Sequence, residues 1–322
     1  MAESNPTPAS RFHWRRLVQF RLRTLLILTT IIALWLGWWS HTARRQRVAV
    51  AALEQDVGWE GGVVSYDYRL PFTSGMDDPP QWPQWLLEKA DKHYFATVYE
   101  VDCASTGFDD ADLKHLQGMT ALKTLKLKGT KITDAGLKNF RKMTALKHAD
   151  LCQTQVTDAG VEHLQNLTAL EWLDLNHTNM GDAGLEHIKK LTALQNLGLS
   201  GTKVTDAGLK HLKGLTSLKR LDLDYTQVTD VGLKHLKGLT SLRRLDLDYT
   251  QVTDAGLVHL QGLKSLKRLS LVFTKVTDSG LEHLKHLTAL EQLDLQHTYV
   301  KDAAAARLRK ALPHCEVQMW MN

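Results

Sequence analysis

The sequence predicts an α/β solenoid, in which a parallel β-sheet lines the concave face and short helices line the convex face. The first observation is a repeat of 24 residues, found in eight consecutive blocks that begin at Phe108, Ile132, Val156, Met180, Val204, Val228, Val252 and Val276. No insertion breaks the register of these blocks, numbered below as repeats one to eight. Each block passes from alternating apolar residues to leucines spaced by three, which indicates a strand joined to a helix.

Repeat five, residues 204–227, is the clearest copy of the template. The last part of its LxxLxL segment, residues 218–223, alternates apolar and exposed positions as a strand requires. Leucines spaced by three suit one face of a short helix: Leu209, Leu212 and Leu215. Thr205 and Asp206 stand where an N-cap and a first-turn acid would start that helix. No repeat can bury its leucines alone, so stacked repeats must share one core.

These repeats resemble the leucine-rich-repeat superfamily, whose L-x-x-L-x-L-x-x-[N/C]-x-[L/I/V] pattern is matched in register over residues 98–299. The TDAGL segment is similar to the 24-residue repeats of bacterial membrane-anchored leucine-rich-repeat proteins, and to the cysteine-containing repeats of substrate-recognition subunits. The resemblance implies a leucine-rich-repeat solenoid. Threonine replaces the usual Asn or Cys in every repeat, from Thr130 to Thr298, which predicts a shorter polar ladder along the array.

The chain divides into five segments by composition. They are a basic cytoplasmic tail (1–23), a transmembrane signal anchor (24–43), an N-terminal cap or linker region (48–97), the array of a half repeat plus eight repeats (98–299) and a C-terminal cap (300–322). In the half repeat, Cys103 takes a core leucine position, so we expect it to be buried. The C-terminal cap should contain a helix, AAAARLRKAL, and an edge strand, EVQM.

The predicted anchor contains sixteen uncharged residues, from Thr24 to Trp39. Three tryptophans cluster at one end of this run, as an interfacial belt would. Five Arg precede the run and three follow it, which places the N-terminus in the cytoplasm and the repeats outside it. The chain is therefore predicted to be a single-pass membrane protein that contacts the lipid bilayer through this helix. A cleaved signal peptide ending near Ala49-Val50-Ala51 is the alternative.

Four prolines interrupt the region between the anchor and the array. Residues 63–70 can form a short strand, residues 77–85 read as a loop, and residues 85–92 can form one or two helical turns. We expect this region to cover the open end of the solenoid, which would otherwise expose apolar surface.

The charge distribution argues against a nucleic-acid partner. The net charge of the whole chain is +5, but residues 1–47 alone have a net charge of +7. The remaining residues therefore have a net charge of −2. Three cysteines are too few for a disulfide framework or a CxxC metal site, and we predict no cofactor.

Exposed strand positions should form columns on the concave face. Arg and aromatic side chains make strong interface anchors, and repeats five to seven combine them with acids. The predicted partner-binding residues are Trp172, Arg220, Asp222, Asp224, Tyr225, Arg244, Asp246, Asp248, Tyr249, Arg268 and Phe273. Two alternatives remain open: the charges neutralise one another across strands, or the near-identity of repeats five and six reflects copied ancestry alone.

The sequence predicts neither a calcium site nor a zinc site. Four nearby carboxylates suggest calcium, but adjacent Arg residues and the lack of a ligand loop argue against it. Histidine recurs at 24-residue intervals on the helices, which lie too far apart for zinc ligands to converge. The chain also lacks nucleophile-elbow, phosphate-loop and HExxH motifs, so it is predicted not to be an enzyme.

We therefore expect a non-catalytic, membrane-tethered module that binds a protein or peptide on its concave face. A substrate-recognition subunit resembling those of ubiquitin ligases is the first alternative, although no F-box precedes the repeats. Binding of cell-wall glycan is the second, because the aromatic residues of repeats five to seven could stack on sugars.

Overall fold

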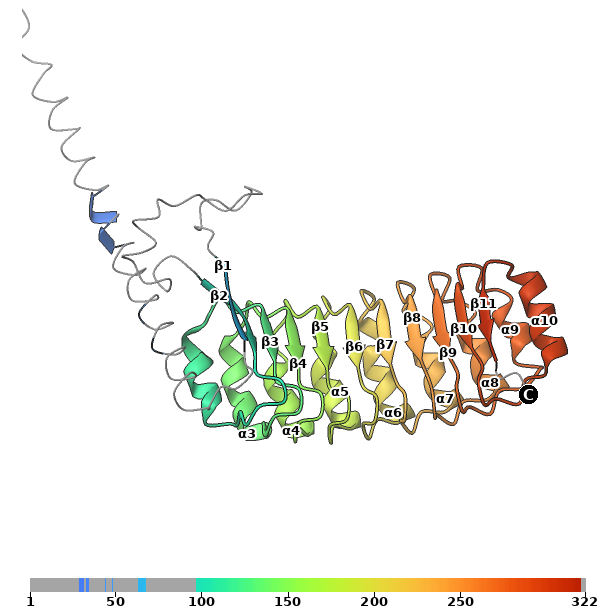
Figure 1. The fold of residues 1–322 in the computed structure, drawn as a ribbon, viewed down its shortest axis with the longest axis horizontal. Coiled ribbons are helices and arrows are strands. Elements are labelled where there is room, and N and C mark those ends of the chain that lie inside the picture. The colour runs from blue at the N-terminus through green and yellow to red at the C-terminus, as the bar shows by residue number, and fades with distance from the viewer. Residues whose placement is uncertain are drawn as a thin grey trace, which may run out of the picture.

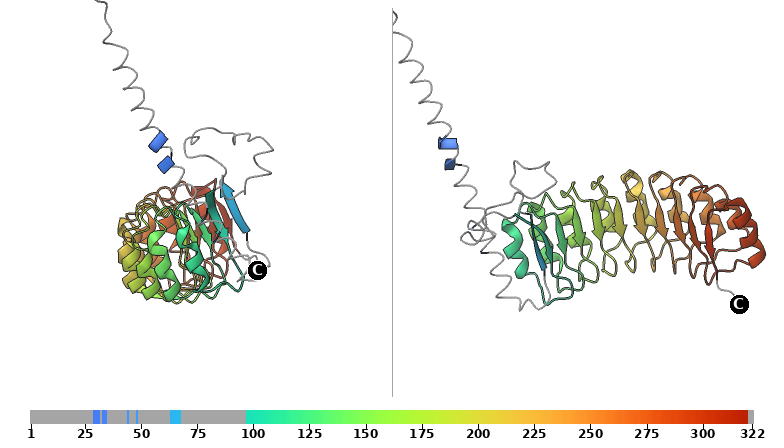
Figure 2. Two further views of the ribbon diagram at one scale, coloured as in Figure 1. Left: turned by 90° about the vertical axis from the view of Figure 1, so that its left-hand side faces the viewer. Right: turned by 45° about the horizontal axis from the view of Figure 1, so that its top comes forward.

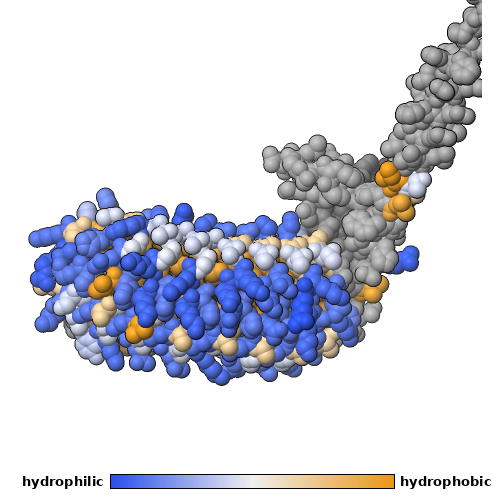
Figure 3. Space-filling model, turned by 180° about the vertical axis from the view of Figure 1, so that it is seen from behind, coloured by the Kyte–Doolittle hydropathy of each residue, from blue (hydrophilic) through white to orange (hydrophobic). Residues whose placement is uncertain are grey.

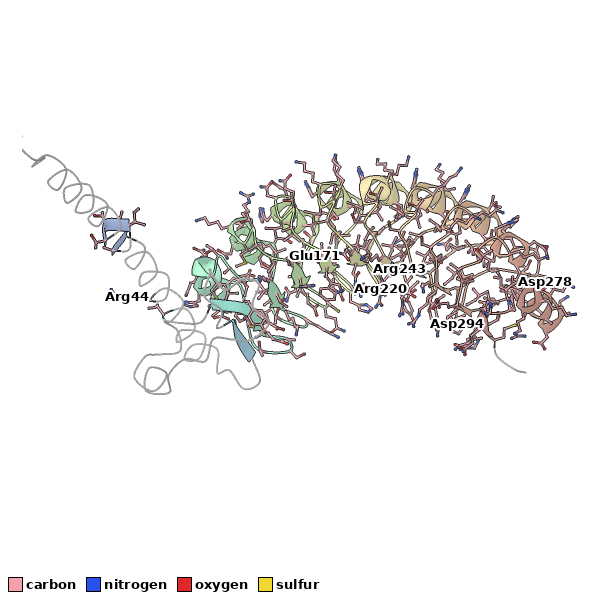
Figure 4. All side chains as sticks on the ribbon, turned by 90° about the horizontal axis from the view of Figure 1, so that it is seen from above. Arg44, Glu171, Arg220, Arg243, Asp278 and Asp294 are labelled. Atoms are coloured by element: carbon pink, nitrogen blue, oxygen red, sulfur yellow. The ribbon has the colours of Figure 1, made fainter. Side chains whose placement is uncertain are left out.

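The computed structural model describes residues 97–319 without a gap, together with residues 29–31, 33–34, 44, 48 and 63–67. The array is a single row of strands with helices packed along one side (Figure 1). Seen from above, the strands follow the inner side of the arc and the helices follow the outer side (Figure 4). The other views in Figure 2 show the same two layers, as the repeat pattern predicted.

One sheet runs through the whole array in chain order. Strand β1 pairs antiparallel with β2, and β2 to β11 form ten parallel strands whose partners are in register from repeat to repeat. The strands are β1 (Val63–Asp67), β2 (Thr97–Asp102), β3 (Thr124–Lys126), β4 (His148–Asp150), β5 (Trp172–Asp174), β6 (Asn196–Gly198), β7 (Arg220–Asp222), β8 (Arg244–Asp246), β9 (Arg268–Ser270), β10 (Gln292–Asp294) and β11 (Glu316–Gln318).

The convex side is built from short helical turns. The α-helices are α3 (Asp134–Leu137), α4 (Asp158–Val161), α5 (Asp182–Ile188), α6 (Asp206–Leu209), α7 (Asp230–Leu233), α8 (Asp254–Leu257), α9 (Leu281–Leu284) and α10 (Asp302–Ala311). The 3₁₀ helices are η2 (Asp112–Gly118), η3 (Lys138–Lys142), η4 (Glu162–Leu164), η5 (Lys210–Gly214), η6 (Lys234–Leu236) and η7 (Val258–Leu260). In several repeats the predicted helix is thus one α-turn followed by a 3₁₀ turn. Leucines spaced by three fit that turn, which has 3.0 residues.

The leucines of all repeats form one continuous core. Its buried residues run from Val98 in the half repeat to Val317 in β11. In repeat five, Leu218, Leu221 and Leu223 are all 0 % exposed. Cys103 is also buried, as its leucine-like position predicted. Stacking therefore supplies the apolar burial that no single repeat can achieve.

A second set of contacts joins neighbouring repeats on the helical side. Asp206 Oδ1 accepts a hydrogen bond from Thr229 N at 2.8 Å, and Asp206 Oδ2 accepts one from Thr229 Oγ1 at 2.6 Å. Thr229 Oγ1 itself accepts from Val231 N at 3.3 Å, which is the expected N-cap. The acid of TDAGL was expected only to start its own helix. It also holds the start of the next one.

The glycine of TDAGL makes room for this acid. A Cβ built on Gly232 would overlap Asp206 Oδ1 and lie 2.9 Å from Leu209 Cδ1. The equivalent Gly160 would meet Asp134 Oδ1 and Leu137 Cδ1 in the same way. Glycine is therefore needed here for close packing between repeats, despite its low helix propensity.

The threonine hydroxyls bond neighbouring backbone groups, as predicted, but each of these bonds lies within one repeat. Thr226 Oγ1 donates to Leu223 O at 2.6 Å, within its own repeat, and Thr250 Oγ1 donates to Leu247 O in the same way. The hydroxyl sits one bond from Cβ, too short to cross the roughly 4.8 Å between strands. Longer side chains make that crossing instead, as where Asn176 Oδ1 accepts from Ser200 N at 2.6 Å.

Elements outside the repeats extend the sheet at both ends. At the first end, β1 pairs with β2 and confirms a strand in the region before the array. At the other end, α10 and β11 confirm the predicted cap, and Arg309 Nη2 donates to Val317 O at 2.8 Å. The expected loop at 77–85 and helical turns at 85–92 lie outside the described residues.

Most of the predicted anchor also lies outside the described residues. Residues 29–31 and 33–34 are helical, with Ile31 56 % and Leu34 70 % exposed. Across the part of the chain that the structure describes, none of the helices is both long enough and apolar enough to cross a bilayer.

Candidate functional site

The strand register confirms the predicted columns on the concave face. Arg220, Arg244 and Arg268 are direct partners on β7, β8 and β9, and Asp222 and Asp246 are partners one step along the same strands. Arg220 and Asp294, labelled in Figure 4, both lie on the inner side of the arc. Repeats five to seven therefore bring most of the predicted binding residues together.

Two of these acids are already neutralised by arginine. Arg244 Nε lies 2.8 Å from Asp246 Oδ2, and Arg220 Nη2 lies 3.7 Å from the same oxygen and 3.9 Å from Asp222 Oδ2. Asp246 is only 4 % exposed and Asp222 only 9 %. These two carboxylates are thus occupied within the protein, as the charge-neutralisation alternative supposed, and offer little surface to a partner.

The other two acids form what we call the acidic pair, Asp224 and Asp248. Asp224 Oδ1 accepts from Asp248 N at 2.6 Å, and Asp248 Oδ1 accepts from Val272 N at 2.8 Å and from Ser270 Oγ at 2.5 Å. Within the described chain neither carboxylate lies in an ion pair with Arg or Lys. The pair therefore holds neighbouring strand ends together without a basic side chain paired to it in the described chain.

Burial perturbs this pair strongly. Burial, reinforced by the Asp222 and Asp248 carboxylates, raises the pKa of Asp224 to about 8. Burial also raises the pKa of Asp248 and, with the neighbouring Asp246, that of Asp222. A nearby cation would stabilise the ionised form of each carboxyl and lower its pKa.

Aromatic rings continue the surface beside the acidic pair. Tyr225 and Tyr249 stack with centroids 4.3 Å apart, Tyr249 and Phe273 with centroids 4.4 Å apart, and Phe273 and His297 with centroids 4.0 Å apart. We call these four residues the aromatic ladder. Tyr225, Tyr249 and Phe273 remain 55 %, 42 % and 43 % exposed. The sequence predicted their proximity but not their mutual stacking.

The residues of the aromatic ladder adopt an unusual backbone conformation. Tyr225, Tyr249 and Phe273 have φ of 54°, 56° and 55°, in the left-handed region where Gly129 and Gly201 occupy the same place in repeats one and four. A bulky residue there costs of order 1–3 kcal/mol. The conformation keeps the backbone in the sheet, since Tyr225 N donates to Asp248 O at 2.8 Å. No periodicity in the sequence signals this turn.

Arg268 and Trp172 differ in their surroundings from the rest of the predicted set. Arg268 is exposed and lies in no ion pair within the described residues; with Arg244, Ser270 and Asp294 it lines a pocket of about 150 Å³. Trp172 is half-buried on β5, between His148 and Asn196, and therefore two strands away from Arg220. It does not join the surface of repeats five to seven.

The structure also assembles a group that the sequence analysis missed. One ligand atom each from Asp150, Cys152 and Asp174 lies within 4.8 Å of the other two. These residues belong to adjacent columns of repeats two and three, so only the lateral pairing of β4 with β5 brings them together. Comparing the exposed strand positions of repeat two with those of repeat three would have placed these three residues close together. The sequence carries no other signal for the group.

On the convex face, the described residues form no comparable group of potential ligands. The helical side seen in Figure 3 is mostly hydrophilic, with small and scattered hydrophobic patches. His163 is buried and receives a hydrogen bond from Arg141 Nε at 3.1 Å, and burial lowers its pKa. Among the described residues no group of histidines converges as metal ligands would.

Comparison with known families agrees with this architecture. A family profile described as leucine rich repeat matches residues 192–252, and a second with the same description matches residues 118–140, 163–189 and 262–285. The chain is a leucine-rich-repeat protein. A comparison with curated proteins found no match in sequence to this leucine-rich-repeat chain.

Solved structures share the fold. Internalin C2 of Listeria monocytogenes is 25 % identical, with a TM-score of 0.50 over 74 % of this leucine-rich-repeat chain and 90 % of internalin C2. A leucine-rich-repeat protein of Leptospira interrogans is 22 % identical, with a TM-score of 0.50 over 64 % of this chain and 56 % of that one. The second likeness is one of fold alone. Leucine-rich-repeat domains typically bind proteins, which makes the concave face the surface to consider.

Proposed function

We propose that this leucine-rich-repeat protein is a non-catalytic module that binds a protein partner on the concave surface of repeats five to seven. The partner presents basic side chains to the acidic pair and packs against the exposed edge of the aromatic ladder. The observation that carries this proposal is the ladder itself: three exposed rings stand on backbone positions where glycine would fold at lower cost.

The aromatic residues support a binding role because they add nothing to the leucine core. Tyr225, the most exposed of the three, leaves 55 % of its surface in water. Tyrosine and arginine are enriched among the residues that dominate binding energy, where truncation costs about 2 kcal/mol or more. Stacking also fixes the rings before the partner arrives, so less side-chain entropy is lost on binding.

The charges favour a basic partner segment. Arg220 and Arg244 are already paired with Asp222 and Asp246, so they leave the acidic pair without a counter-ion. Lysine or arginine from a partner would supply that counter-ion and would form charge-assisted hydrogen bonds to the free carboxylate oxygens. Because cation binding favours ionised Asp224, whose pKa is about 8, affinity should rise as the pH increases from 6 to 8.

The glycan alternative fits the ladder less well. Sugars pack against the open faces of aromatic rings. Both faces of Tyr249 and of Phe273 are covered by the neighbouring rings of the stack. Edges and hydroxyl groups are what the ladder offers, and these suit polar and charged groups of a protein.

Membrane tethering through residues 24–43 is part of the same proposal. Its support is the uncharged run from Thr24 to Trp39 and the arginines on both sides. The bilayer would hold the N-terminus on the cytoplasmic side and the repeats on the opposite side. Fusing a reporter that is active only in the cytoplasm to the C-terminus tests this orientation, since an active fusion would reverse it.

The binding proposal is tested by capture with the full chain carrying a C-terminal affinity tag. The double variant Asp224→Asn, Asp248→Asn keeps oxygens that accept the backbone hydrogen bonds and removes both ionisable carboxyl groups. The matched control is Glu186→Gln, Glu282→Gln, which removes two exposed carboxylates from α5 and α9 on the convex side. A partner lost at least tenfold with the first variant and retained by the control supports the proposal. Equal retention by both variants contradicts it.

A further inference from the structure

A second group on the concave face has metal-binding chemistry of its own, away from the proposed partner surface. It consists of Asp150 and Cys152 from repeat two and Asp174 from repeat three, whose ligand atoms all lie within 4.8 Å of one another. From these contacts we propose that Asp150, Cys152 and Asp174 form a zinc site, with one thiolate and two carboxylates as its protein ligands.

The thiol is the observation that separates this group from the repeated acids around it. Cys152 is only 6 % exposed, and its Sγ makes no hydrogen bond within the described chain. The Sγ lies within 4.8 Å of a carboxylate oxygen of Asp150 and of one of Asp174, and Cys152 is not part of the leucine core. A buried thiol beside two carboxylates is a ready metal ligand, since metal binding replaces its proton.

The carboxylates are oriented by the backbone. Asp150 Oδ1 accepts from Cys152 N at 3.0 Å, and Asp174 Oδ1 accepts from Asn176 N at 2.8 Å. These bonds leave Oδ2 of each carboxylate without a hydrogen bond or an ion pair among the described residues. One oxygen of each acid is therefore held in place while the other is available to an ion, an arrangement typical of supported metal ligands.

The ligand set selects the metal. Calcium takes six to eight oxygens, so a thiol is a poor ligand for it. Zinc accepts both sulfur at about 2.3 Å and carboxylate oxygen at about 2.0–2.2 Å. Ligands around tetrahedral zinc are then roughly 3.3–3.8 Å apart, so the group must tighten by about 1 Å. Water from the concave side would complete the coordination shell.

The electrostatic environment of these three residues also favours a bound cation. Burial raises the pKa of Cys152 to about 11, with the Asp174 and Asp150 carboxylates adding to the effect, and burial also raises the pKa of each of those acids. A divalent cation would offset this cost for all three groups together. An exposed lysine, Lys128, acts on both acids and favours their ionised forms, but it forms no ion pair with either of them within 4 Å. Lys128 would compete with zinc for the same carboxylates.

Cobalt and zinc titrations of the full chain, purified with a tag that contains no histidine, test the site. Co²⁺ bound by a thiolate gives a sulfur-to-metal absorption band, which histidines on the convex face cannot produce. We expect this band in the wild type and expect Zn²⁺ to remove it. Cys152→Val should abolish the band and weaken Zn²⁺ binding at least tenfold. Valine is a conservative choice because Val272 occupies the same column in repeat seven.

Three further variants make the result decisive. Asp174→Asn keeps an oxygen for Asn176 N but should also weaken Zn²⁺ binding, whereas Lys128→Gln should strengthen it by removing a competing cation. Asp294→Asn, in the same column as Asp174 but far along the array, should change nothing. Circular dichroism confirms that each variant is folded. A cobalt band that survives Cys152→Val, or no band in the wild type at saturating Co²⁺, overturns the proposal.

Discussion

Replacing Asp206 with alanine tests how neighbouring repeats are joined on the helical side. The change removes two hydrogen bonds to Thr229, one from its backbone N at 2.8 Å and one from its hydroxyl at 2.6 Å. Hydrogen bonds to charged groups contribute about 1.5–3 kcal/mol each. Because Thr229 is only partly buried, water can replace part of the stabilisation that the two hydrogen bonds provide. We therefore expect the free energy of unfolding to fall by about 3 kcal/mol.

The effect should be local as well as global. In a solenoid each repeat contacts only its neighbours, so a broken link weakens the interface between repeats five and six first. Hydrogen exchange of the full chain should therefore quicken at the amides of Thr229 and Gly232 before it quickens in repeats one and eight. Urea denaturation followed by circular dichroism gives the accompanying change in total stability.

Asp302→Ala is the matched control for this experiment. Asp302 holds the same first-turn position in α10, but it makes no hydrogen bond in the described part of the chain. Its loss should cost only the helix-dipole contribution of about 0.3–1 kcal/mol. If Asp206→Ala costs no more than Asp302→Ala, the acid merely starts its own helix and the inter-repeat reasoning fails.

Three other predictions concern packing, the left-handed turn and pH. Gly232→Ala should destabilise the protein by about 1–3 kcal/mol through overlap with Asp206, whereas Gly214→Ala, whose Cβ would meet nothing within 4 Å, should be neutral in the same denaturation assay. Tyr249→Gly should be more stable than Tyr249→Ala by about 1 kcal/mol, because φ is 56° there; equal stability of the two would remove the strain argument. Asp224 has a folded pKa of about 8, above its ordinary 3.8, so its contribution to stability is greatest below pH 4 and is lost as the pH rises to 8. Asp224→Asn should flatten that decline, and Glu186→Gln should leave it unchanged.

The local pattern of the sequence determined most of the fold. Leucine spacing in LxxLxL defines a strand because side chains alternate across it, and the 24-residue period without insertions requires equivalent strands to lie side by side. The columns of Arg220, Arg244 and Arg268, the burial of Cys103 and the C-terminal cap all followed from these regularities. Each depends only on neighbours along the chain or on a fixed repeat length.

Contacts that depend on how two repeats meet were decided by the tertiary structure. Asp206 reaches Thr229, and Asp174 approaches Cys152, because stacking brings residues more than 20 positions apart within hydrogen-bond or ligand distance. The left-handed turn at Tyr225 and the ion pair of Asp246 with Arg244 likewise follow from strand geometry and side-chain length. Periodicity specifies which residues share a column, but the distance between columns and the direction of each side chain come only from packing in three dimensions.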